Sequence, residues 1–407
     1  MRSSLYANIN YILFSALLVF FPISMILEIN FYDEFFVLLC IFFFIKFKKK
    51  DLDSSDRKVI LCLLVSYAIG IVSNFKSKII PINITAAIDL FSVYKFALVF
   101  IALRNLVTIT SRKKIVFIIS KISKIFVIFS FVFCILSQFI DLGMTYGERY
   151  GIKAFHFIFG NHSHFGIILI ACLLIIGFSE SKRKNVFTIY LIISIIPLLL
   201  TTKGVIYSFL IFSAIFLILN RKKVLKIKNF ILPIIILLFV SSLQINDYFK
   251  NEDSIRMTFF FFAIKTANNY FPLGSGFATY GSAEAAKNYS PLYYEYGFNN
   301  LYGLGDTDDN NMYLNDNYWA TIIGELGYIG FGFMVLMFLY IFKIFNNYEY
   351  IDARSKLLLI SALIMLFISS IATGIIKSMP GVFLFSIFAI LLPNKHEKAQ
   401  LNNINNN

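Results

Sequence analysis

Long apolar runs alternate with short charged connections along most of this chain of 407 residues. A helix needs about 20 mostly apolar residues to cross the hydrocarbon of a bilayer, and many of the runs reach or approach that length. The pattern therefore predicts an all-α integral membrane protein with about twelve transmembrane helices. We expect the spans near residues 11–28, 31–46, 58–74, 79–102, 118–140, 155–178, 186–202, 204–219, 229–245, 318–342, 357–376 and 379–393.

One polar stretch, residues 246–317, is much longer than the other connections and is rich in Tyr and Asn. A loop of this length is usually functional or disordered, and its tyrosine content argues against disorder. Within it, residues 255–267 predict a helix that lies on the membrane or dips into it. The chain then divides into a first membrane region at 1–245, the large loop at 246–317, a second membrane region at 318–393 and a disordered tail at 394–407.

Basic residues decide the expected orientation. Lys and Arg gather in alternate connections, at 46–58, 104–124, 182–184 and 221–228, and are sparse in the connections between them. Membrane proteins concentrate Lys and Arg in their cytoplasmic loops. We therefore expect both termini in the cytoplasm and the large loop on the outer side of the membrane.

The composition agrees with a bilayer environment. Hydrophobic residues make up 58% of the chain and charged residues 15%, whereas soluble domains average about 45–50% and about 25%. A net charge of +14 could suggest a nucleic-acid partner, but the bias toward the cytoplasmic loops accounts for it. The cysteines lie inside apolar runs and form no C-x-x-C pair, so we expect buried small hydrophobic residues and neither disulfides nor a metal site. They are Cys40, Cys62, Cys134 and Cys172.

The remaining polar groups gather at the expected outer face, in a chain without the phosphate-loop, dinucleotide-binding or serine-hydrolase motifs of soluble enzymes. The large loop has an amphipathic stretch led by Arg256, then the segment 269–280, and it closes on the segment 316–330. Two shorter polar segments stand at the same face: 160–166, which contains His162 and His164, and 201–204, which contains Lys203.

In this order the segments resemble the bacterial O-antigen polymerase and ligase superfamily, membrane enzymes that join lipid-linked polysaccharide units. That family shows an Arg-led helix, a P-x-G-x-G-x-x-x-[FY] element, a short polar pair and a Glu-Gly-x-x-Gly helix start. The matching positions are Pro272, Gly274, Gly276, Tyr280, Glu325, Gly327 and Gly330, with Glu325 and Gly327 separated by Leu326. The resemblance covers residues 160–345, and Lys203 stands where the family has Arg in an outer turn.

The resemblance implies a donor sugar on an isoprenoid pyrophosphate, which is an anion at the membrane surface. Arg can hold a phosphate with a bidentate fork and Lys offers a point charge, and positioned cations stabilise a charged leaving group. Our candidate donor-binding cations are therefore Arg149, Lys203 and Arg256. Tyr280, Asn317 and Tyr318 are expected to contact substrate as well, since sugars pack on aromatic rings and bond to amides.

The acceptor needs a base for its attacking hydroxyl, and the expected candidates are Asp316, His162 and His164, with Glu325 as a further catalytic candidate. Many ligases of the family carry His at the position of Asp316, so the Asp favours a polymerase. Each of these residues also has a structural interpretation. Arg149 and Lys203 could snorkel to the interface, Asp316 could cap the next span, and Gly274 and Gly276 could only form turns. Glu325, and Asp89 in the fourth predicted span, are costly unless paired.

We interpret the sequence as a membrane glycosyltransferase that polymerises undecaprenyl-pyrophosphate-linked oligosaccharides at the outer face of the bacterial cytoplasmic membrane. No cofactor or metal is expected, because the donor is already activated. Expected partners are the lipid-linked saccharides, membrane lipids and a chain-length regulator, with no nucleic acid. The open alternatives are a ligase of the same superfamily, a lipid-linked oligosaccharide flippase and a membrane acyltransferase. Charges at span ends and the large loop favour the enzyme over the flippase, and residues 1–47 lack the His and Arg motifs of the acyltransferase.

Overall fold

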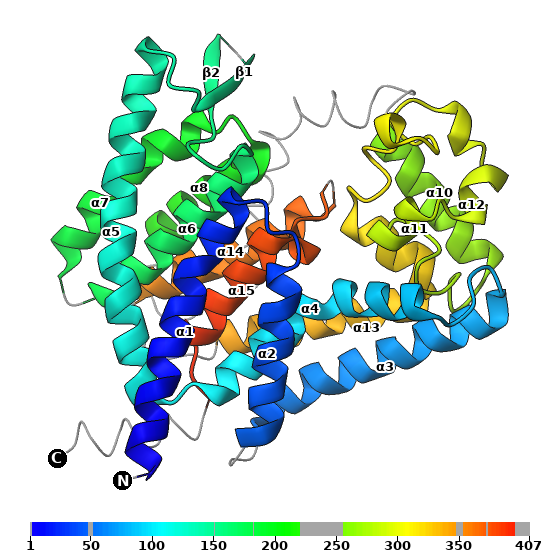
Figure 1. The fold of residues 1–407 in the computed structure, drawn as a ribbon, viewed down its shortest axis with the longest axis horizontal. Helices are drawn as coiled ribbons and strands as arrows, with labels where there is room; N and C mark the ends of the chain where they lie inside the picture. Colours follow the sequence, from blue (N-terminus) through cyan, green and yellow to red (C-terminus); the bar gives the residue numbers. More distant parts are fainter. Residues whose placement is uncertain are drawn as a thin grey trace.

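Apolar runs fold as helices here because a helix satisfies every backbone hydrogen bond within its own segment. The computed structural model describes residues 2–47, 52–149, 151–181, 183–219, 255–346, 353–371 and 373–394 (Figure 1). Side chains are described from residue 11 onward, except those of residues 47, 149, 184, 205, 215–219, 308 and 353. In order, the elements of the first membrane region are α1 (Arg2–Ile26), α2 (Tyr32–Phe47), α3 (Ser54–Ser77), α4 (Ile84–Leu106), α5 (Ile109–Phe139), β1 (Thr145–Arg149), β2 (Ile152–Phe155), α6 (His162–Ser179), α7 (Lys184–Leu200) and α8 (Gly204–Leu219).

The large loop and the second membrane region follow. Their elements are α10 (Ile255–Asn269), α11 (Ala283–Lys287), α12 (Pro291–Glu295), the 3-10 turns η2 (Phe298–Asn300) and η3 (Asp308–Asn310), α13 (Tyr318–Asn346), α14 (Ala353–Ser369), the 3-10 turn η4 (Ile375–Lys377) and α15 (Met379–Leu391). The helix predicted at 255–267 is present as α10.

The described helices include five that are long and apolar enough to cross a membrane, namely α3, α4, α5, α6 and α13. A helix also lies at every other predicted span that falls within the described ranges, although most of these are shorter. The ninth predicted span, 229–245, lies outside the described residues, as does the predicted tail from residue 395 onward. The residues that the structure describes are thus all-helical apart from one small hairpin, as in an all-α membrane protein, and the count of twelve spans stays a prediction.

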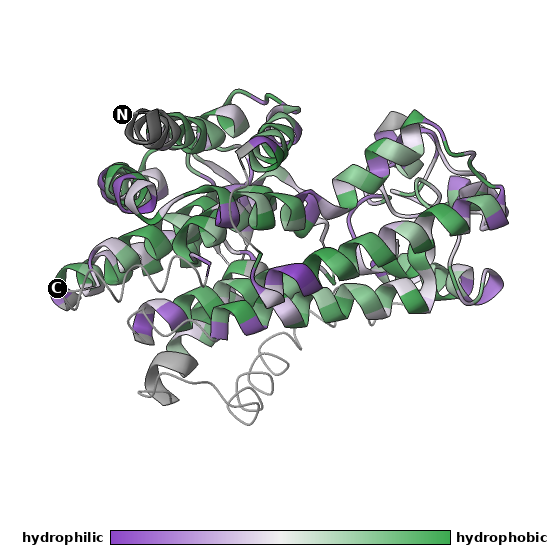
Figure 2. Ribbon diagram, turned by 90° about the horizontal axis from the view of Figure 1, so that it is seen from below, coloured by the Kyte–Doolittle hydropathy of each residue, from purple (hydrophilic) through white to green (hydrophobic). Residues whose placement is uncertain are grey.

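Helix α5 gives the clearest indication that the outward faces of the helices are suited to contact with lipid. Its buried face includes small and weakly polar side chains, among them Ser123, Ser130 and Cys134. Its outward face carries Ile125 and Phe129, which are 58% and 53% exposed. Small residues at helix interfaces and apolar residues outside are typical of membrane proteins, in which lipid solvates the outer face. Figure 2 shows the same apolar character along most helices, with hydrophilic residues in short stretches.

The core of the membrane region is built around α15. This helix packs against α4, α6 and α2, and every residue from Pro380 to Leu391 is buried. Two buried arginines hold its C-terminal end. Arg112 donates to the carbonyl oxygens of Ala389 and Ile390 at 2.5 and 2.6 Å, and Arg104 donates to that of Pro393 at 3.3 Å. Cations that bond to the last carbonyls of a helix also complement its dipole.

The predicted span at 155–178 begins later than expected, because Phe155 ends a β-hairpin and residues 156–161 connect that hairpin to α6. Strands β1 and β2 pair antiparallel, with Glu148 opposite Lys153. The apolar residues that suggested a span here pack on α5 and α6 through their rings, for example Phe157 against Phe126 at 5.7 Å. Helix α6 starts only after Asn161, whose side chain caps it. An aromatic run can therefore be buried without being part of a membrane helix.

The described part of the large loop is folded. Residues of α10, α12 and the connecting turns surround an aromatic core, in which Phe259 stacks on Tyr280 with ring centroids 4.8 Å apart. Tyr293 and Phe298 stack in the same core. In Figure 1 these segments form a lobe at one end of α3, α4 and α13. The order of this segment follows from its aromatic content, because buried rings supply the apolar area that a polar loop lacks.

Candidate functional site

The two glycine-containing segments that the sequence singled out dock on each other. Helix α13 is broken at Gly327, which has φ 63° and ψ −167°. The break frees backbone carbonyl groups one turn earlier, and the loop after α10 supplies their donors. The N–H of Ser275 donates to the carbonyl oxygen of Gly324 at 2.9 Å, and the N–H of Gly276 donates to that of Glu325 at 2.8 Å. Segments 272–280 and 324–330 thus form one structural unit.

Glycine is required at the contact because backbone meets backbone there. A Cβ on Gly274 would lie 2.4 Å from the nitrogen of Gly327, and a Cβ on Gly327 would lie 2.5 Å from the nitrogen of Gly274. Both residues also have positive φ, at 79° and 63°. A side chain at either position would clash and would strain the backbone. The sequence interpretation of Gly274 as only a turn former is therefore incomplete.

Two buried carboxyl groups bind the loop from opposite helices. Asp89 of α4 accepts from the N–H of Ala278 at 2.6 Å. Glu325 of α13 accepts from the N–H groups of Thr279 and Tyr280, both through Oε1, at 3.1 and 3.2 Å. Asp89 and Glu325 are each only 1% exposed and lie within electrostatic reach of each other. Through these hydrogen bonds both acids hold the backbone of the loop in position.

Lys377, in the turn η4 between α14 and α15, supplies the cation for this pair. Its Nζ donates to the carbonyl oxygen of Gly281 at 2.9 Å, in a site where the residue is 7% exposed. Burial lowers the pKa of Lys377 to about 8, whereas the nearby carboxyl groups of Asp89 and Glu325, and that of Asp316, oppose this fall. We name Asp89, Glu325, Lys377 and the loop 274–281 the loop cluster.

Helix α3 holds the other side of the same loop. Asn74 accepts from the N–H of Phe277 at 2.7 Å, and its side-chain amide donates to the carbonyl oxygen of that residue at 2.9 Å. Ser73 and Ser77 donate to the carbonyl oxygens of Leu273 and Ser275, both at 2.6 Å. Polar side chains of a predicted span thus satisfy backbone groups that enter between α3 and α13, as buried irregular backbone requires.

An ion pair stands at the exposed edge of the loop cluster. Arg256, at the start of α10, and Asp316, just before α13, lie 3.2 Å apart with side chains 24% and 38% exposed. The guanidinium of Arg256 also lies 5.5 Å from the ring centroid of Tyr313. Asp316 is within electrostatic reach of Lys377, which connects this pair to the loop cluster. Here the structure brings a candidate cation and a candidate base together at an accessible position.

The cap of α13 is Asn317 and not Asp316. Asn317 accepts from the N–H of Ala320 at 3.0 Å, which leaves the carboxylate of Asp316 for Arg256. Asn317 itself is 1% exposed.

Two of the expected substrate-contacting residues are fully buried. The hydroxyl of Tyr280 donates to the carbonyl oxygen of Phe259, and the hydroxyl of Tyr318 donates to that of Val93 at 3.4 Å. Neither ring is exposed. Because no face of either ring can meet a sugar in this arrangement, we do not carry them into the proposed site.

The other candidates form a second group around the β-hairpin. Nε2 of His162 lies 3.1 Å from the carbonyl oxygen of Tyr146 and 3.2 Å from that of Ala154, so this nitrogen carries the proton. Lys203, in the turn between α7 and α8, lies within electrostatic reach of His162. Arg149 ends β1, where it pairs with Ile152 across the hairpin.

We name His162, Lys203 and the hairpin strand that ends at Arg149 the hairpin cluster. His164 lies two residues after His162 in the first turn of α6, and its N–H donates to the capping side chain of Asn161 at 3.4 Å. In Figure 1 the hairpin stands beside the upper end of α5, whereas α10 lies in the lobe on the opposite side of the view. The described structure therefore separates the expected cations into two groups, with Arg256 apart from Arg149 and Lys203.

Sequence reasoning missed Lys377 and Asn74 as parts of the site. In the sequence Lys377 is only one base between two predicted spans, and Asn74 is one polar residue at the end of a predicted span. The useful signal was Asp89, a carboxyl inside an apolar run that needed a partner. No pattern in the sequence identified that partner, because α4, α13 and η4 are distant along the chain.

A second buried ion-pair group lies farther along α4. Nζ of Lys95 contacts Asp33 and lies 2.6 Å from Oε1 of Glu34, both at the start of α2. Lys95 is also within electrostatic reach of Lys377. Buried charges thus extend from α2 through α4 to the loop cluster, in a part of the fold where single unpaired charges would be costly.

Comparison with known proteins adds no assignment: neither a family model nor a curated protein sequence matches this chain.

Proposed function

We propose that the chain is a membrane glycosyltransferase that joins undecaprenyl-pyrophosphate-linked oligosaccharide repeats into a polysaccharide at the outer face of the cytoplasmic membrane. The observation that carries the proposal is the docking of the segment 272–280 on the break in α13 beside the Arg256–Asp316 pair. The segments that resemble polymerase motifs are separate in the sequence. In the fold they lie at one place, next to an accessible cation and carboxylate. If the Arg256–Asp316 pair served only to pack the loop, it would not need to be accessible.

The reaction that fits this pair is a displacement at the anomeric carbon of the donor. The acceptor hydroxyl oxygen forms the new bond to that carbon, the bond to the pyrophosphate oxygen breaks, and the pyrophosphate leaves with the electron pair. In the proposal Arg256 binds the leaving pyrophosphate, and Asp316 takes the proton of the acceptor hydroxyl. A pyrophosphate that binds Arg256 competes with Asp316 for the guanidinium, so donor binding would release the carboxylate to act as base.

Glu325 has a positioning role in this proposal. Its Oε1 is occupied by two backbone N–H groups, and the residue is 1% exposed. Together with Asp89 and Lys377 it fixes the loop that lies between α4 and α13. The hairpin cluster, with His162 and Lys203, remains a candidate for binding the second lipid-linked substrate, which also carries a pyrophosphate.

A ligase of the same superfamily is the second candidate. It uses the same donor and the same leaving group, and the accessible Arg256–Asp316 pair would serve it equally well. The two differ in the acceptor, which is another lipid-linked repeat for the polymerase and a surface molecule such as the lipid A core for the ligase. A flippase is a weaker candidate, because the charges of the loop cluster are engaged in holding a loop.

The function is tested by deletion and by variants of Arg256, read as the length of the saccharide ladder relative to membrane abundance of the protein. A charge-assisted contact contributes about 1.5–3 kcal/mol, which corresponds to roughly 10- to 150-fold in rate. We expect Arg256→Ala to lose most polymer at normal abundance, and Arg256→Lys to keep measurable activity because the charge remains without the fork. Lys265→Ala, nine residues farther along α10, is the matched control and should retain the full ladder.

The same assay separates the candidates. For a polymerase, deletion leaves single repeats on the surface acceptor; for a ligase, polymer accumulates on the lipid carrier and no repeat is attached. If Arg256 only anchored the loop, Lys would serve as well as Arg, and Ala would lower abundance rather than activity per molecule. Full activity of Arg256→Ala at normal abundance would remove Arg256 from the site.

A further inference from the structure

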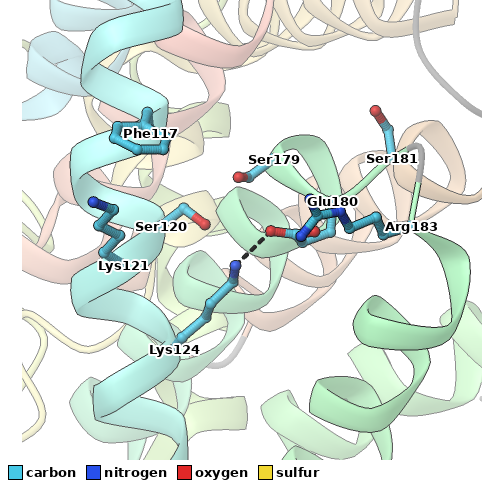
Figure 3. A pocket seen from close by; sticks show the side chains of 8 residues that line it. All are labelled: Phe117, Ser120, Lys121, Lys124, Ser179, Glu180, Ser181 and Arg183. Atoms are coloured by element: carbon cyan, nitrogen blue, oxygen red, sulfur yellow. Dashed lines mark hydrogen bonds and ion pairs between the residues drawn. The ribbon is translucent and has the colours of Figure 1, made fainter.

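A polar pocket of about 470 Å³ lies far from the loop cluster, between α5 and the connection that joins α6 to α7. Figure 3 shows its lining, in which one wall is α5 and the other is the end of α6 with the following turn. Its lining residues are Phe117, Ser120, Lys121, Lys124, Ser179, Glu180, Ser181 and Arg183. The basic-residue bias predicts the cytoplasmic side for this connection, opposite the proposed glycosyltransferase site.

The charge of the pocket is positive after its own ion pair is counted. Lys124 and Glu180 contact each other through Nζ and Oε1, and their side chains are 24% and 11% exposed. Lys121 and Arg183 are the further bases of the lining, and Glu180 is its one acid. The pocket therefore has more cations than its carboxylate can neutralise, which favours an anionic ligand.

A buried hydroxyl also faces the pocket. Ser120 is 1% exposed, and its Oγ has no hydrogen-bond partner among the described residues. Figure 3 shows this hydroxyl directed from α5 toward the opposite wall. A buried polar atom without a partner is uncommon in folded proteins and calls for an explanation such as a bound ligand. The hydroxyl can donate to an acceptor oxygen placed between the two walls.

Apolar surface continues directly from the charged rim. Phe117 and Ile125, one helical turn on either side of Lys121 on α5, are 57% and 58% exposed. Nζ of Lys121 lies 4.3 Å from the ring centroid of Phe117, so charged and apolar groups adjoin. A soluble anion would use only the polar part of this surface, whereas a lipid would use both, with its acyl chains along the outward face of α5.

We propose that this pocket binds the phosphate group of an anionic membrane lipid. The guanidinium of Arg183 would hold two phosphate oxygens with its fork, Lys121 would add a point charge, and Ser120 would donate one hydrogen bond. Arg183 also precedes α7, which has no side-chain cap, so the positive end of the helix dipole adds to the same field. Basic pockets between helices on the cytoplasmic side are suited to lipid headgroups. The inference is independent of the reaction proposed for the outer face.

The test measures lipid binding to the full-length protein in detergent micelles by native mass spectrometry, with phosphatidylglycerol as the anionic probe and phosphatidylethanolamine as the zwitterionic one. We expect tighter binding of phosphatidylglycerol, and a loss of at least about tenfold in Lys121→Gln/Arg183→Gln, since both charge-assisted contacts to the phosphate are removed. Ser120→Ala should weaken binding by a smaller factor. The matched control is Lys113→Gln, which removes an exposed base of α5 outside the pocket lining.

Three outcomes would overturn the proposal. One is equal binding of the two lipids; another is unchanged phosphatidylglycerol binding in the double variant. The third is that inorganic phosphate binds at the pocket while phosphatidylglycerol does not compete with it, which would assign the site to a soluble anion. Because Lys121 and Arg183 are at an exposed rim, membrane abundance and the thermal unfolding midpoint of the double variant should stay at wild-type values, and both are measured for every variant.

Discussion

Lys377 is the residue on which the charge balance of the loop cluster depends. It is buried between two helices and faces Asp89 and Glu325, which themselves bind backbone N–H groups. Two carboxyl groups share one ammonium group in a site that excludes water. The stability of the fold is therefore sensitive to loss of the ammonium group, because an uncompensated buried charge costs several kcal/mol. The lowered pKa of Lys377 shows the same competition, with burial opposing the charge and the carboxyl groups supporting it.

Removing this cation should destabilise the protein strongly. Lys377→Met keeps the length of the side chain but leaves the carboxyl groups unneutralised, with an expected loss of about 3–5 kcal/mol in the free energy of unfolding. Adding Glu325→Gln should recover a large part of it, since the Gln oxygen can still accept from Thr279 and Tyr280. Thermal unfolding in detergent measures both variants. Lys76→Met, at an exposed lysine of α3, is the control; a Lys377→Met protein as stable as this control would contradict the charge balance.

At this scale the sequence predicted which residues needed partners but not the partners themselves. Asp89 and Glu325 were identified because a carboxyl inside an apolar run is costly. Both carboxyl groups accept hydrogen bonds from the backbone of residues 278–280. No side-chain pattern in the sequence marks these backbone groups as partners. Tyr280 shows the opposite error: its motif position suggested contact with sugar, but the ring completes the aromatic core of the loop.

Among the elements, the broken helix α13 and the loop after α10 determine the geometry of the site. The break at Gly327 turns a continuous apolar run into a helix with acceptors in its middle. Figure 1 shows the loop and its lobe at this end of α13, with α3 and α4 alongside. The elements are held there by direct hydrogen bonds from α3 and α4 and not by apolar packing alone.

A methyl group at Gly274 should separate the loop from α13. Gly274→Ala places a Cβ against the backbone of Gly327 and adds the strain of positive φ, for an expected loss of about 3 kcal/mol or more. Gly297→Ala is a matched control, because its φ is also positive, at 71°, but no atom lies within 4 Å of the added Cβ. Thermal unfolding and limited proteolysis of the loop compare the two. Equal effects would mean that strain, and not the close contact, accounts for the requirement.

Element positions were predictable where apolar length and capping residues agree. Helix α4 starts after Asn83, whose side chain accepts from the N–H of Ala86 at 3.2 Å, although the predicted span began at residue 79. Helix α5 starts after Thr108, well before the predicted start at 118, because its first polar turns are still helical. The hairpin at 145–155 was not predicted, since its closing residues are as apolar as those of a span.

Two properties concern the molecule as a whole: which helix faces contact lipid, and on which side of the membrane each connection lies. The outward apolar face of α5 and the inward serines indicate which surface faces the acyl chains. The two candidate sites, the loop cluster and the pocket beside α5, occupy separate parts of the fold. Their assignment to opposite sides of the membrane rests on the distribution of basic residues.

That assignment can be checked with reporters. A fusion of alkaline phosphatase after Gly303, in the large loop, should be active, because the enzyme folds only on the oxidising outer side. A fusion after Lys184, beside the basic pocket, should be inactive, whereas a fluorescent-protein fusion there should be bright. An inactive phosphatase at Gly303 with normal expression would reverse the orientation, and the proposal for the outer face would fail with it.

The sequence could predict the class of the molecule because lipid imposes its own composition on every outward face. It could not predict the separation of the expected cations. Arg149, Lys203 and Arg256 were placed together only because all three lie at the expected outer face, and a face of a many-helix protein is wide. Position along the membrane plane depends on helix packing, for which no local pattern exists.

The break in α13 also bears on how the chain is made. Gly324 and Glu325 obtain hydrogen-bond donors from Ser275 and Gly276, and Ser275 is synthesised 49 residues before Gly324. Asn74, which holds the same loop, is synthesised earlier still. A helix with unsatisfied carbonyl groups is costly in lipid, by several kcal/mol for each group. During biogenesis the broken form of α13 is therefore low in cost only after the earlier segments have assembled, so that the break itself depends on correct folding of the loop.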